Sequence, residues 1–598
     1  MLLRKSLLCA TICVPSLMLG TVGLAHAATA TANATAAAVA PVAPRQGARA
    51  PASFEAAQRD EHAVRTATPI DHLVVIYDEN VSFDHYFATY PTAANPNGEP
   101  RFSALPGTPT VNNLVTAHLL TNNPNASTAL NGTNAANPFR LDRTQAATAD
   151  QNHAYTAEQQ AYDAGKMDLF PTYTGSATSG GAGAFGTKGQ VMGYYDGNTV
   201  TALWNYAQHF AMNDKSFTNT YGPSTPGALE VVSGQTDGLD LVATTYSPFT
   251  LAAYSFYIKD GQGGFNLIND VDPAYDTCSS TTNQVLMKGK NIGDLLDAAH
   301  ITWGGFMGGF NLGLTNPNGT TGCKRSTGSA VVGPTADYIP HHNWFQYFAT
   351  TSNPTHARPA SVMDIGYSFD ANGKPDPANH EYDLNDFYAS VRAGNFPAVS
   401  YIKMPAYEDG HAGYSDPLDE QAGIVKLVNF LQKQPQWKNT AVIINWDDSD
   451  GWYDHDFHTP TSSSYDSQAD QLDGAGMCGS GKAPKGLAGK PVNGRCGPGT
   501  RLPFIVISPW SRQNYVDHTL TSQASVVSFI EDNWLHEERL GGGSFDAQDQ
   551  SIMNMFDFNG RPHMQPLILN PKTGEVVSRG QDHDQDGHGH GHDHAQRS

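Results

Sequence analysis

The stretch AVIINWDDSDGWYDHDFH, residues 441–458, decides how we expect the chain to fold. It opens on a run of apolar and β-branched residues, which is typical of a buried strand. The carboxylates of Asp447 and Asp448 follow directly, and Asp450 stands beyond them. In open α/β sheets, ligands bind beyond the carboxyl ends of the strands. Because neighbouring carboxylates repel each other unless a cation or proton lies between them, the stretch predicts a metal site at a strand end.

A second stretch, HLVVIYDENVSFDHYF at residues 72–87, repeats this arrangement. An apolar strand is again followed by oxygen ligands, here Glu79 and Asn80. Asp and Asn also end strands through ordinary turn chemistry, which is the alternative for either stretch alone. The occurrence of two such strand ends favours a shared metal site.

Helical and strand patterns alternate through the rest of the chain. The expected helices are 159–167, 201–213, 291–300, 385–394, 419–433 and 523–535, and the further strands are 301–306, 398–404 and 502–507. Such alternation predicts an α/β fold with a mainly parallel sheet covered by helices on both faces. The polar segments 92–150 and 461–498 read as long loop insertions.

The composition describes a globular chain rich in loops. Of the 598 residues 39% are hydrophobic and only 15% charged, and 58 are Gly and 37 Pro. This length suits several small domains or one large domain with insertions. The net charge of −22 argues against nucleic acid as a partner, because such binding needs a basic surface.

The first residues have the pattern of a signal peptide, 1–27. A basic pair, Arg4-Lys5, precedes an apolar region, and Ala25-His26-Ala27 fits the cleavage rule. An uncleaved anchor is the alternative. No other run approaches the ~20 apolar residues of a membrane span, so we expect no transmembrane segment in the mature protein, which would be periplasmic or secreted.

Three further segments complete the expected organisation. A flexible leader rich in Ala, Thr and Pro covers 28–66, and one catalytic domain covers 67–570. A disordered tail rich in His and Asp covers 571–598 and contains DHDQDGHGHGHDH at 582–594. This tail either binds a metal such as zinc or is merely solvated.

Four cysteines remain once the signal peptide is removed. An even number of cysteines in an exported chain predicts two disulfides. Of the three possible pairings we favour the local one, Cys278–Cys323 and Cys478–Cys496. A zinc site is the alternative, although no CxxC spacing supports it.

The segment NTYGPSTPGALEVVSG at 219–234 offers a nucleophile. If a helix begins within it, Ser224 lies at the N-terminal end, where free N–H groups and the helix dipole suit a phosphate. A serine there can attack phosphorus once a cation or a base lowers its pKa. The alternative is an ordinary helix cap, for which Ser-Thr-Pro is common.

Several short motifs stand in order between about residues 69 and 540. They are ENVSFDHYF at 79–87, GPSTPG at 222–227, PHHNWF at 340–345, PAVS at 397–400, DGH at 409–411, DDSDGWYDH at 447–455, RLP at 501–503 and SPW at 508–510. Together they resemble the bacterial phosphoesterase family that holds phospholipases C and a branch of acid phosphatases.

This resemblance implies an alkaline-phosphatase-like α/β/α sandwich that hydrolyses phosphoric esters with a divalent metal ion of open identity. It implies that Glu79, Asn80, Asp447 and Asp448 hold the metal. Ser224 would be the nucleophile, and His153, His342 and His411 would contact phosphate oxygens or the leaving group. The neighbouring pairs Asp84-His85 and Asp454-His455 we interpret as structural.

Four departures from the phospholipase C pattern favour the acid phosphatase branch. They are Ser224 where that branch has Thr, Asp447-Asp448 where it has Asp-Glu, no Arg-Arg pair, and little chain beyond about residue 570. We therefore expect a secreted acid phosphatase that cleaves phosphomonoesters through a phosphoserine. The alternatives are a phospholipase C acting on phosphocholine-type phospholipid headgroups and an exported metal-binding protein with a vestigial site. The oligomeric state stays open.

Overall fold

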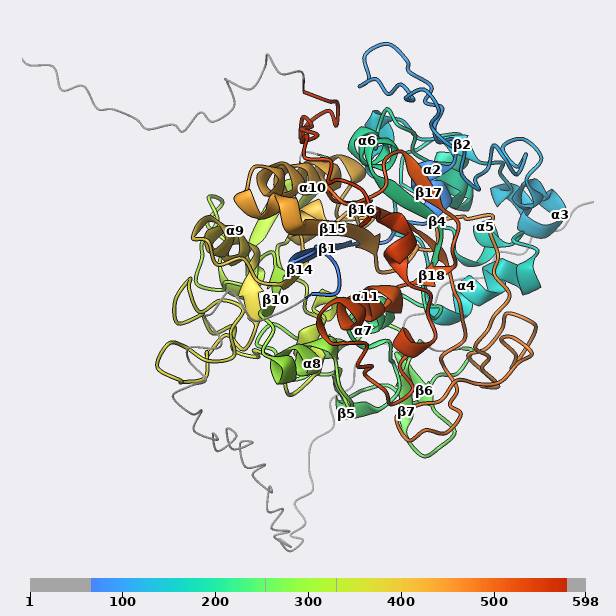
Figure 1. The fold of residues 1–598 in the computed structure, drawn as a ribbon. Helices are drawn as coiled ribbons and strands as arrows, with labels where there is room; N and C mark the ends of the chain where they lie inside the picture. The colour runs from blue at the N-terminus through green and yellow to red at the C-terminus, as the bar shows by residue number, and fades with distance from the viewer. Residues whose placement is uncertain (1–65, 253, 330, 578–598) are drawn as a thin grey trace, which may run out of the picture. The chain divides into compact units, whose positions relative to one another are not determined.

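The computed structural model describes residues 66–577, apart from 253 and 330 (Figure 1). The predicted signal peptide, the leader up to residue 65 and the His/Asp-rich stretch 582–594 lie outside the described residues. Residues 571–577, which we predicted to belong to a disordered tail, are part of the folded chain. Asn205 donates a hydrogen bond of 2.9 Å to the carbonyl of Gly574, so the folded part extends past residue 570.

A nine-stranded sheet forms the centre of the described chain, in the order β13-β10-β14-β1-β15-β16-β4-β17, with β18 also paired to β4. Only β16 among these strands runs antiparallel to its neighbours, which confirms the mainly parallel sheet. The strands are β1 His72–Asp78, β4 Ala211–Phe217, β10 Trp303–Met307, β13 Glu381–Asp383, β14 Val399–Lys403, β15 Thr440–Trp446, β16 Arg501–Ile507, β17 Tyr515–Asp517 and β18 Thr521–Ser522.

The pairing of β1 with β15 brings the two acidic stretches together. These strands are parallel neighbours, and their last residues, Asp78 and Trp446, are partners in the register. The residues that follow both strands therefore leave the sheet at the same edge. Both strands are rich in β-branched residues and are buried except at His72, which explains why this pair lies in the middle of the sheet.

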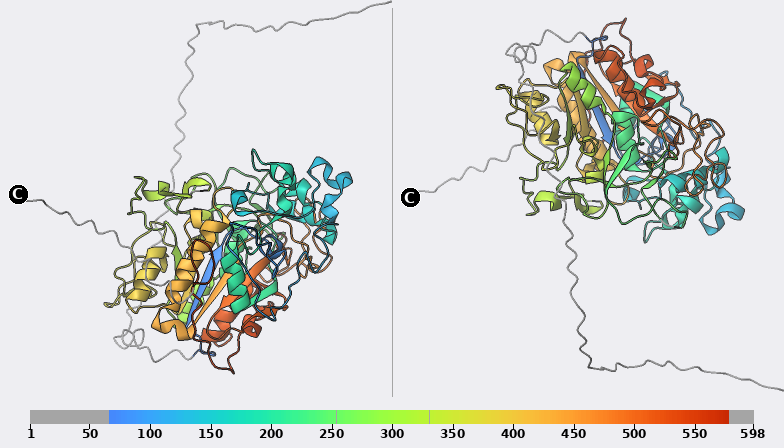
Figure 2. Two further views of the ribbon diagram at one scale, coloured as in Figure 1. Left: turned by 90° about the horizontal axis from the view of Figure 1, so that it is seen from above. Right: turned by 90° about the horizontal axis from the view of Figure 1, so that it is seen from below.

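Helices cover both faces of the sheet (Figures 1 and 2). Successive side chains of a strand point to opposite faces, so Val74 and Ile76 of β1 pack in one core and Leu73 and Val75 in another. The first core is closed by α6 Thr201–His209, α9 Leu384–Arg392 and α10 Pro417–Gln432. The second is closed by α7 Ser224–Ser233, α8 Ile292–Ala299 and α11 Ala524–Trp534. None of the helices among the described residues is both long and apolar enough to cross a membrane.

The remaining α-helices and strands are short and lie outside the nine-stranded sheet. The helices are α2 Phe83–Phe87, α3 Thr128–Asn131, α4 Tyr155–Tyr162 and α5 Phe170–Tyr173. The strands are β2 Phe139–Arg140, β3 Gly193–Tyr194, β5 Leu239–Ala243, β6 Tyr257–Lys259, β7 Phe265–Leu267, β8 Asp272–Pro273, β9 Gln284–Met287, β11 Ser326–Ser329 and β12 Gly333–Ala336.

Two predicted helices end earlier than expected. The helix predicted over 201–213 stops at His209, and β4 begins at Ala211. The sequence of β4, AMNDKSF, has no strand pattern, and its pairing with β16 and β17 overrides that local preference. The helix predicted over 159–167 is α4, which is followed by left-handed backbone at Asp163 (φ 41°).

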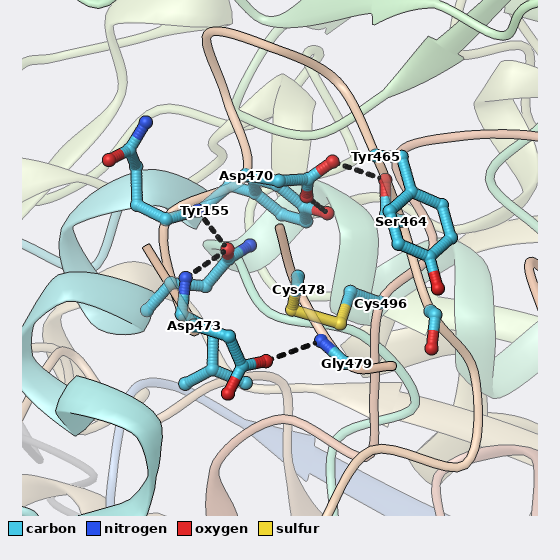
Figure 3. The surroundings of a disulfide bond; sticks show 12 residues. Tyr155, Ser464, Tyr465, Asp470, Asp473, Cys478, Gly479 and Cys496 are labelled. Carbon is cyan, nitrogen blue, oxygen red and sulfur yellow. Dashed lines mark hydrogen bonds between the residues drawn. A yellow bond between two sulfur atoms is a disulfide. The ribbon is translucent and has the colours of Figure 1, made fainter. Parts of the chain in front are cut away.

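Both predicted disulfides are present, Cys278–Cys323 and Cys478–Cys496. The second joins two residues within the insertion 461–498, and Figure 3 shows it together with Asp470 of the insertion and Tyr155 of α4. The Tyr155 hydroxyl donates a hydrogen bond of 2.7 Å to Asp470. Since α4 directly follows His153, this insertion supports the segment that carries a predicted site residue.

Candidate active site

Ser224 is the first residue of α7 and lies at the edge of the sheet where β1 and β15 end. Its side chain is 1% exposed. The Ser224 hydroxyl lies within hydrogen-bond distance of two carboxylates, 2.9 Å from Glu79 Oε2 and 3.2 Å from Asp448 Oδ2. The turn before it needs glycine, because Gly222 has φ 119° and a Cβ there would lie 2.7 Å from the Ile268 carbonyl.

The four predicted metal ligands lie together around Ser224. The backbone N–H of Asn80 donates to Asp447 Oδ1 over 3.1 Å, which ties the end of β1 to the end of β15. The side-chain amide position of Asn80 that faces the carboxylates lies 2.6 Å from Glu79 Oε2 and 3.0 Å from Asp447 Oδ1. Asp447 Oδ2 is buried without a hydrogen-bond partner among the described residues.

The orientation of the Asn80 amide follows from its other neighbour, His411. Its second amide position lies 3.0 Å from His411 Nε2. His411 Nδ1 lies 2.5 Å from the Ala412 carbonyl and must therefore carry the ring proton, which leaves Nε2 as an acceptor. Asn80 accordingly donates through Nδ2 to His411 and turns Oδ1 toward the carboxylates.

This oxygen cluster fits a divalent cation. Carboxylate oxygens of Glu79, Asp447 and Asp448 surround the Asn80 amide oxygen, and without a cation these oxygens would face one another. Hard divalent ions prefer such ligands, and an ion bound there would also partner the unsatisfied oxygen of Asp447. The roles of Glu79, Asn80, Asp447 and Asp448 as ligands stay a prediction that this geometry supports.

Asp447 and Asp448 of the cluster hold protons more tightly than usual. Burial raises the pKa of Asp447 to about 7, with a further contribution from Glu79. Burial also raises the pKa of Asp448 well above its ordinary value, although His153 opposes it. A cation must displace these protons, so its binding weakens as the pH falls.

Lys403 is a site residue that sequence reasoning missed. It ends β14, is 1% exposed, pairs with Glu79 Oε1 and lies 3.7 Å from Asp447 Oδ2. Burial lowers its pKa, but Glu79 and Asp447 outweigh burial and raise it, so the ammonium stays charged. The available signal was a single lysine in the otherwise uncharged strand VSYIK, which must meet a carboxylate if it is buried.

The three predicted histidines also lie at the site, in different charge states. His342 Nδ1 is 3.1 Å from Glu79 Oε1, and burial followed by the charge of His341 lowers the pKa of His342 well below its ordinary value. Burial lowers the pKa of His411 to about 4. Burial alone would also lower the pKa of His153, but the carboxylates of Asp448 and Asp450 raise it well above its ordinary value. His153 is therefore the histidine that holds a proton to give.

Glu158 of α4 is a second residue that the sequence did not reveal. It is 1% exposed and makes two hydrogen bonds of 2.9 Å, one from the Gly222 N–H and one from the Ser449 hydroxyl. Burial raises its pKa to about 7, against the effects of Gly222, His153 and Ser449. Glu158 thus connects the turn before Ser224 to the loop that carries Asp448.

We expect Glu158→Ala to lower kcat for phosphoester hydrolysis by about 10- to 100-fold with little change in KM. A displacement of about 1 Å between nucleophile and cation has this effect on rate. Steady-state kinetics would measure it beside Glu158→Gln, whose amide oxygen still accepts from the Gly222 N–H while its NH2 group can only donate toward Ser449, and beside the exposed control Glu538→Gln. Equal kcat for Glu158→Ala and the control would contradict this role.

A cavity of about 340 Å³ opens beside His153 and Pro223, the residue before Ser224. Two carboxylates, an aromatic ring and no Lys or Arg belong to its lining. The lining residues are Asp150, Gln151, Asn152, His153, Ala154, Ser176, Pro223, Tyr254 and Asp270. The cavity thus offers an approach toward Ser224 that is lined by two carboxylates.

Asp84 and Asp454, which we interpreted as structural, lie around the buried Arg501. Asp454 accepts a hydrogen bond of 3.0 Å from Nε of the buried Arg501, and Asp84 lies 3.4 Å from the same guanidinium. His455 contacts Asp84, and the ring of His85 is stacked on Trp452 with centroids 3.9 Å apart. These groups bind one another beneath the site.

Comparisons with known proteins identify relatives of the chain. The sequence model of the phosphoesterase family matches residues 70–535. Non-hemolytic phospholipase C of Burkholderia pseudomallei is 24% identical over 482 residues, which are 78% of this chain and 55% of that protein. Its counterpart in Pseudomonas aeruginosa is 24% identical over 474 residues, 77% of this chain and 53% of that protein. Phospholipase C A of Mycobacterium tuberculosis strain H37Rv is 22% identical over 76% of this chain and 71% of that protein.

The chain spans about half the length of the first two of these relatives. Among solved structures, murine ectonucleotide pyrophosphatase/phosphodiesterase 5 aligns with 60% of this chain and 95% of its own, at 11% identity and a TM-score of 0.27.

Proposed function

The chain belongs to the phosphoesterase family, and on that premise we propose that it hydrolyses phosphoric esters with Ser224 as the nucleophile. The observation that carries the proposal is the position of the Ser224 hydroxyl at the start of α7, 2.9 Å from Glu79 and 3.2 Å from Asp448. A hydroxyl buried between two carboxylates is placed to lose its proton when phosphorus approaches.

The residues of the site divide the reaction between them. A divalent cation held by Glu79, Asn80, Asp447 and Asp448 would favour the ionised Ser224 hydroxyl and offset the charge that develops on the phosphoryl oxygens. Ser224 Oγ forms a bond to phosphorus while the bond from phosphorus to the leaving oxygen breaks. Glu79 Oε2 accepts the serine proton, and His153 donates a proton to the leaving oxygen. Water then gives a proton to His153 and forms a bond to phosphorus, while the bond from phosphorus to Ser224 Oγ breaks and Oγ takes back the proton from Glu79.

The preferred substrate that we propose is a phosphodiester in which the alcohol that stays on phosphorus carries a positive charge, as phosphocholine does in the reaction named for phospholipase C. The cavity has Asp150, Asp270 and Tyr254 in its lining beside His153, and no Lys or Arg. A doubly charged phosphomonoester is repelled there more than a singly charged diester. A quaternary ammonium group gains attraction from both carboxylates and the ring.

The relatives reported above also bear the name phospholipase C. They weigh against the acid phosphatase that we predicted from Ser224 and Asp447-Asp448. Phosphomonoester hydrolysis remains the second candidate, because a serine nucleophile beside a cation can act on either ester. Disulfides form and persist in oxidising compartments outside the cytosol. Because the chain has two of them, we propose that the protein is exported.

A substrate comparison tests this proposal on the chain from residue 28 onward. We expect p-nitrophenyl phosphorylcholine to be cleaved with a higher kcat/KM than p-nitrophenyl phosphate, and EDTA to abolish both activities. In Asp270→Asn the kcat/KM for the choline ester should fall about three- to tenfold, because one carboxylate is lost. Bis(p-nitrophenyl) phosphate, which has no cation, is the matched control and should be unaffected.

Each other result has a definite meaning. A preference for p-nitrophenyl phosphate would assign the chain to the acid phosphatases. No turnover of any of these esters by metal-loaded protein would favour an exported metal-binding protein with a vestigial site.

A further inference from the structure

A segment without charge borders the entrance of the active site. Residues 241–258, LVATTYSPFTLAAYSFYI, contain no charged side chain, although the chain carries a net charge of −22. The part between β5 and β6, residues 244–256, is called the aromatic loop below. Among its described residues, Tyr246 is 40% exposed, Leu251 53% and Tyr254 46%.

The exposed side chains of the aromatic loop are held in place by buried neighbours. The ring of Tyr246 packs against Tyr254 and Phe256, with centroids 5.9 and 6.0 Å apart. Phe256 is buried, and the Tyr257 hydroxyl donates a hydrogen bond of 3.0 Å to the Tyr246 carbonyl. The backbone of Phe249 bonds to that of Tyr257 over 3.0 Å. These contacts hold the exposed side chains of the aromatic loop in a fixed position.

Two contacts connect the aromatic loop to the nucleophile. Tyr254 lines the active-site cavity, and its hydroxyl donates to the Asp270 carbonyl over 3.3 Å. The Asp270 carboxylate in turn accepts a hydrogen bond of 2.9 Å from the N–H of Thr225, next to Ser224. Whatever surface the loop contacts is thereby brought to the mouth of the cavity.

We infer that the aromatic loop docks on a zwitterionic phospholipid surface and presents the cavity to the headgroups. This inference rests on the proposed function, since only a substrate held in a lipid surface requires such docking. Tyrosine and leucine side chains are favoured at the boundary between headgroups and acyl chains, and an uncharged segment enters it without desolvating a charge. The acidic chain would be repelled by anionic lipids, so the lipid that fits is phosphatidylcholine.

Vesicle binding tests the inference independently of turnover. The chain from residue 28 with Ser224→Ala would be sedimented with phosphatidylcholine vesicles, so that no lipid is hydrolysed. We expect Leu251→Asp to lower the partition coefficient at least tenfold, because a leucine that would enter the lipid surface is replaced by a charge. Leu314→Asp, a change at a leucine that is 40% exposed outside the loop, is the matched control and should leave binding unchanged.

Activity of the same loop variants on two substrates separates this inference from the proposed function. Leu251→Asp with Ser224 intact should cleave soluble p-nitrophenyl phosphorylcholine within about twofold of the unmodified chain, but lose at least tenfold on phosphatidylcholine vesicles. Soluble diester cleavage without vesicle binding, or equal loss of binding in Leu251→Asp and Leu314→Asp, would overturn the docking while leaving the proposed function intact. Vesicle binding by a chain that cleaves no ester would instead overturn the proposed function.

Discussion

Ser224→Ala is expected to lower kcat by at least about a thousandfold for every phosphoester that the protein cleaves. Removing the nucleophile of a covalent mechanism leaves only the contribution of substrate binding and charge stabilisation by the rest of the site. The Ser224 hydroxyl is the group that the structure places between Glu79 and Asp448 at the start of α7. The measurement is steady-state hydrolysis of p-nitrophenyl phosphorylcholine and p-nitrophenyl phosphate.

Two further observations separate a lost nucleophile from a damaged site. The alanine variant should bind as much divalent metal as the unmodified chain, because the four predicted ligands are unchanged. Acid quenching during turnover should trap phosphocholine or phosphate on Ser224 of the unmodified chain, according to the substrate, and neither on the variant.

Ser224→Thr is the matched control for the alanine change. It keeps a hydroxyl and adds one methyl group, so it should retain a measurable part of the activity. Turnover in Ser224→Ala close to that of the unmodified chain would show that water, rather than this serine, attacks phosphorus.

The strand ends of the site were predictable from sequence because their signal is local. The apolar runs before Glu79 and Asp447 are short, β-branched and buried on both faces, and a parallel pair of such strands must place the following residues at one edge. The histidines were found by resemblance rather than by physics, since a lone histidine carries no local pattern. Their charge states depend on burial and on partners far away in sequence, which only the fold specifies.

Other site residues were hidden because their function lies in contacts between distant segments. Glu158 looks like any polar residue on a helix until α4 is placed against Gly222 and Ser449. Lys403 is an isolated lysine in a strand until Glu79 is placed beside it. His411 was predicted to contact phosphate, and the structure gives it a second task as the acceptor that orients Asn80.

The predicted fold failed in one place for a physical reason. β4 carries Asn213, Asp214 and Lys215 in succession, which no pattern of strand formation accommodates. These side chains are satisfied by tertiary partners, including a hydrogen bond of 2.8 Å to the Asp214 carboxylate from Asn112 and an ion pair of 2.6 Å between Lys215 and Asp456. A periodic pattern of apolar residues predicts which side chains are buried. In β4 the polar side chains of Asn213 and Asp214 are buried as well, because they have partners.

Arg501→Met is expected to lower the free energy of unfolding by about 3–5 kcal/mol, because it leaves buried carboxylates without their cation. Arg501 is fully buried at the start of β16. It makes hydrogen bonds of 3.0 and 3.1 Å to Asp454 and lies 3.4 Å from Asp84. The guanidinium thereby joins β16, α2 and the loop after β15, so its loss affects the sheet as a whole.

The effect of Arg501→Met should depend on pH in a defined direction. Burial raises the pKa of Asp454 to about 6 in the folded chain, although Arg501 opposes the rise. Without the guanidinium that pKa rises further, so the folded variant holds its proton to a higher pH than the unfolded chain does. When the pKa of a carboxyl is higher in the folded than in the unfolded chain, the folded chain becomes less stable as the pH rises toward the folded pKa. The destabilisation by Arg501→Met should therefore be larger at pH 8 than at pH 5.

Urea denaturation of the disulfide-bonded chain at pH 5 and pH 8 would measure both effects. Arg501→Lys is the matched control, since it keeps the charge but loses the paired geometry of the guanidinium. Its free energy of unfolding should lie between those of the unmodified chain and Arg501→Met. The guanidinium also lies over the Phe83 ring, 4.3 Å from its centroid. An equal loss of stability at both pH values would therefore assign the role of Arg501 to packing on Phe83 rather than to the charges of Asp84 and Asp454.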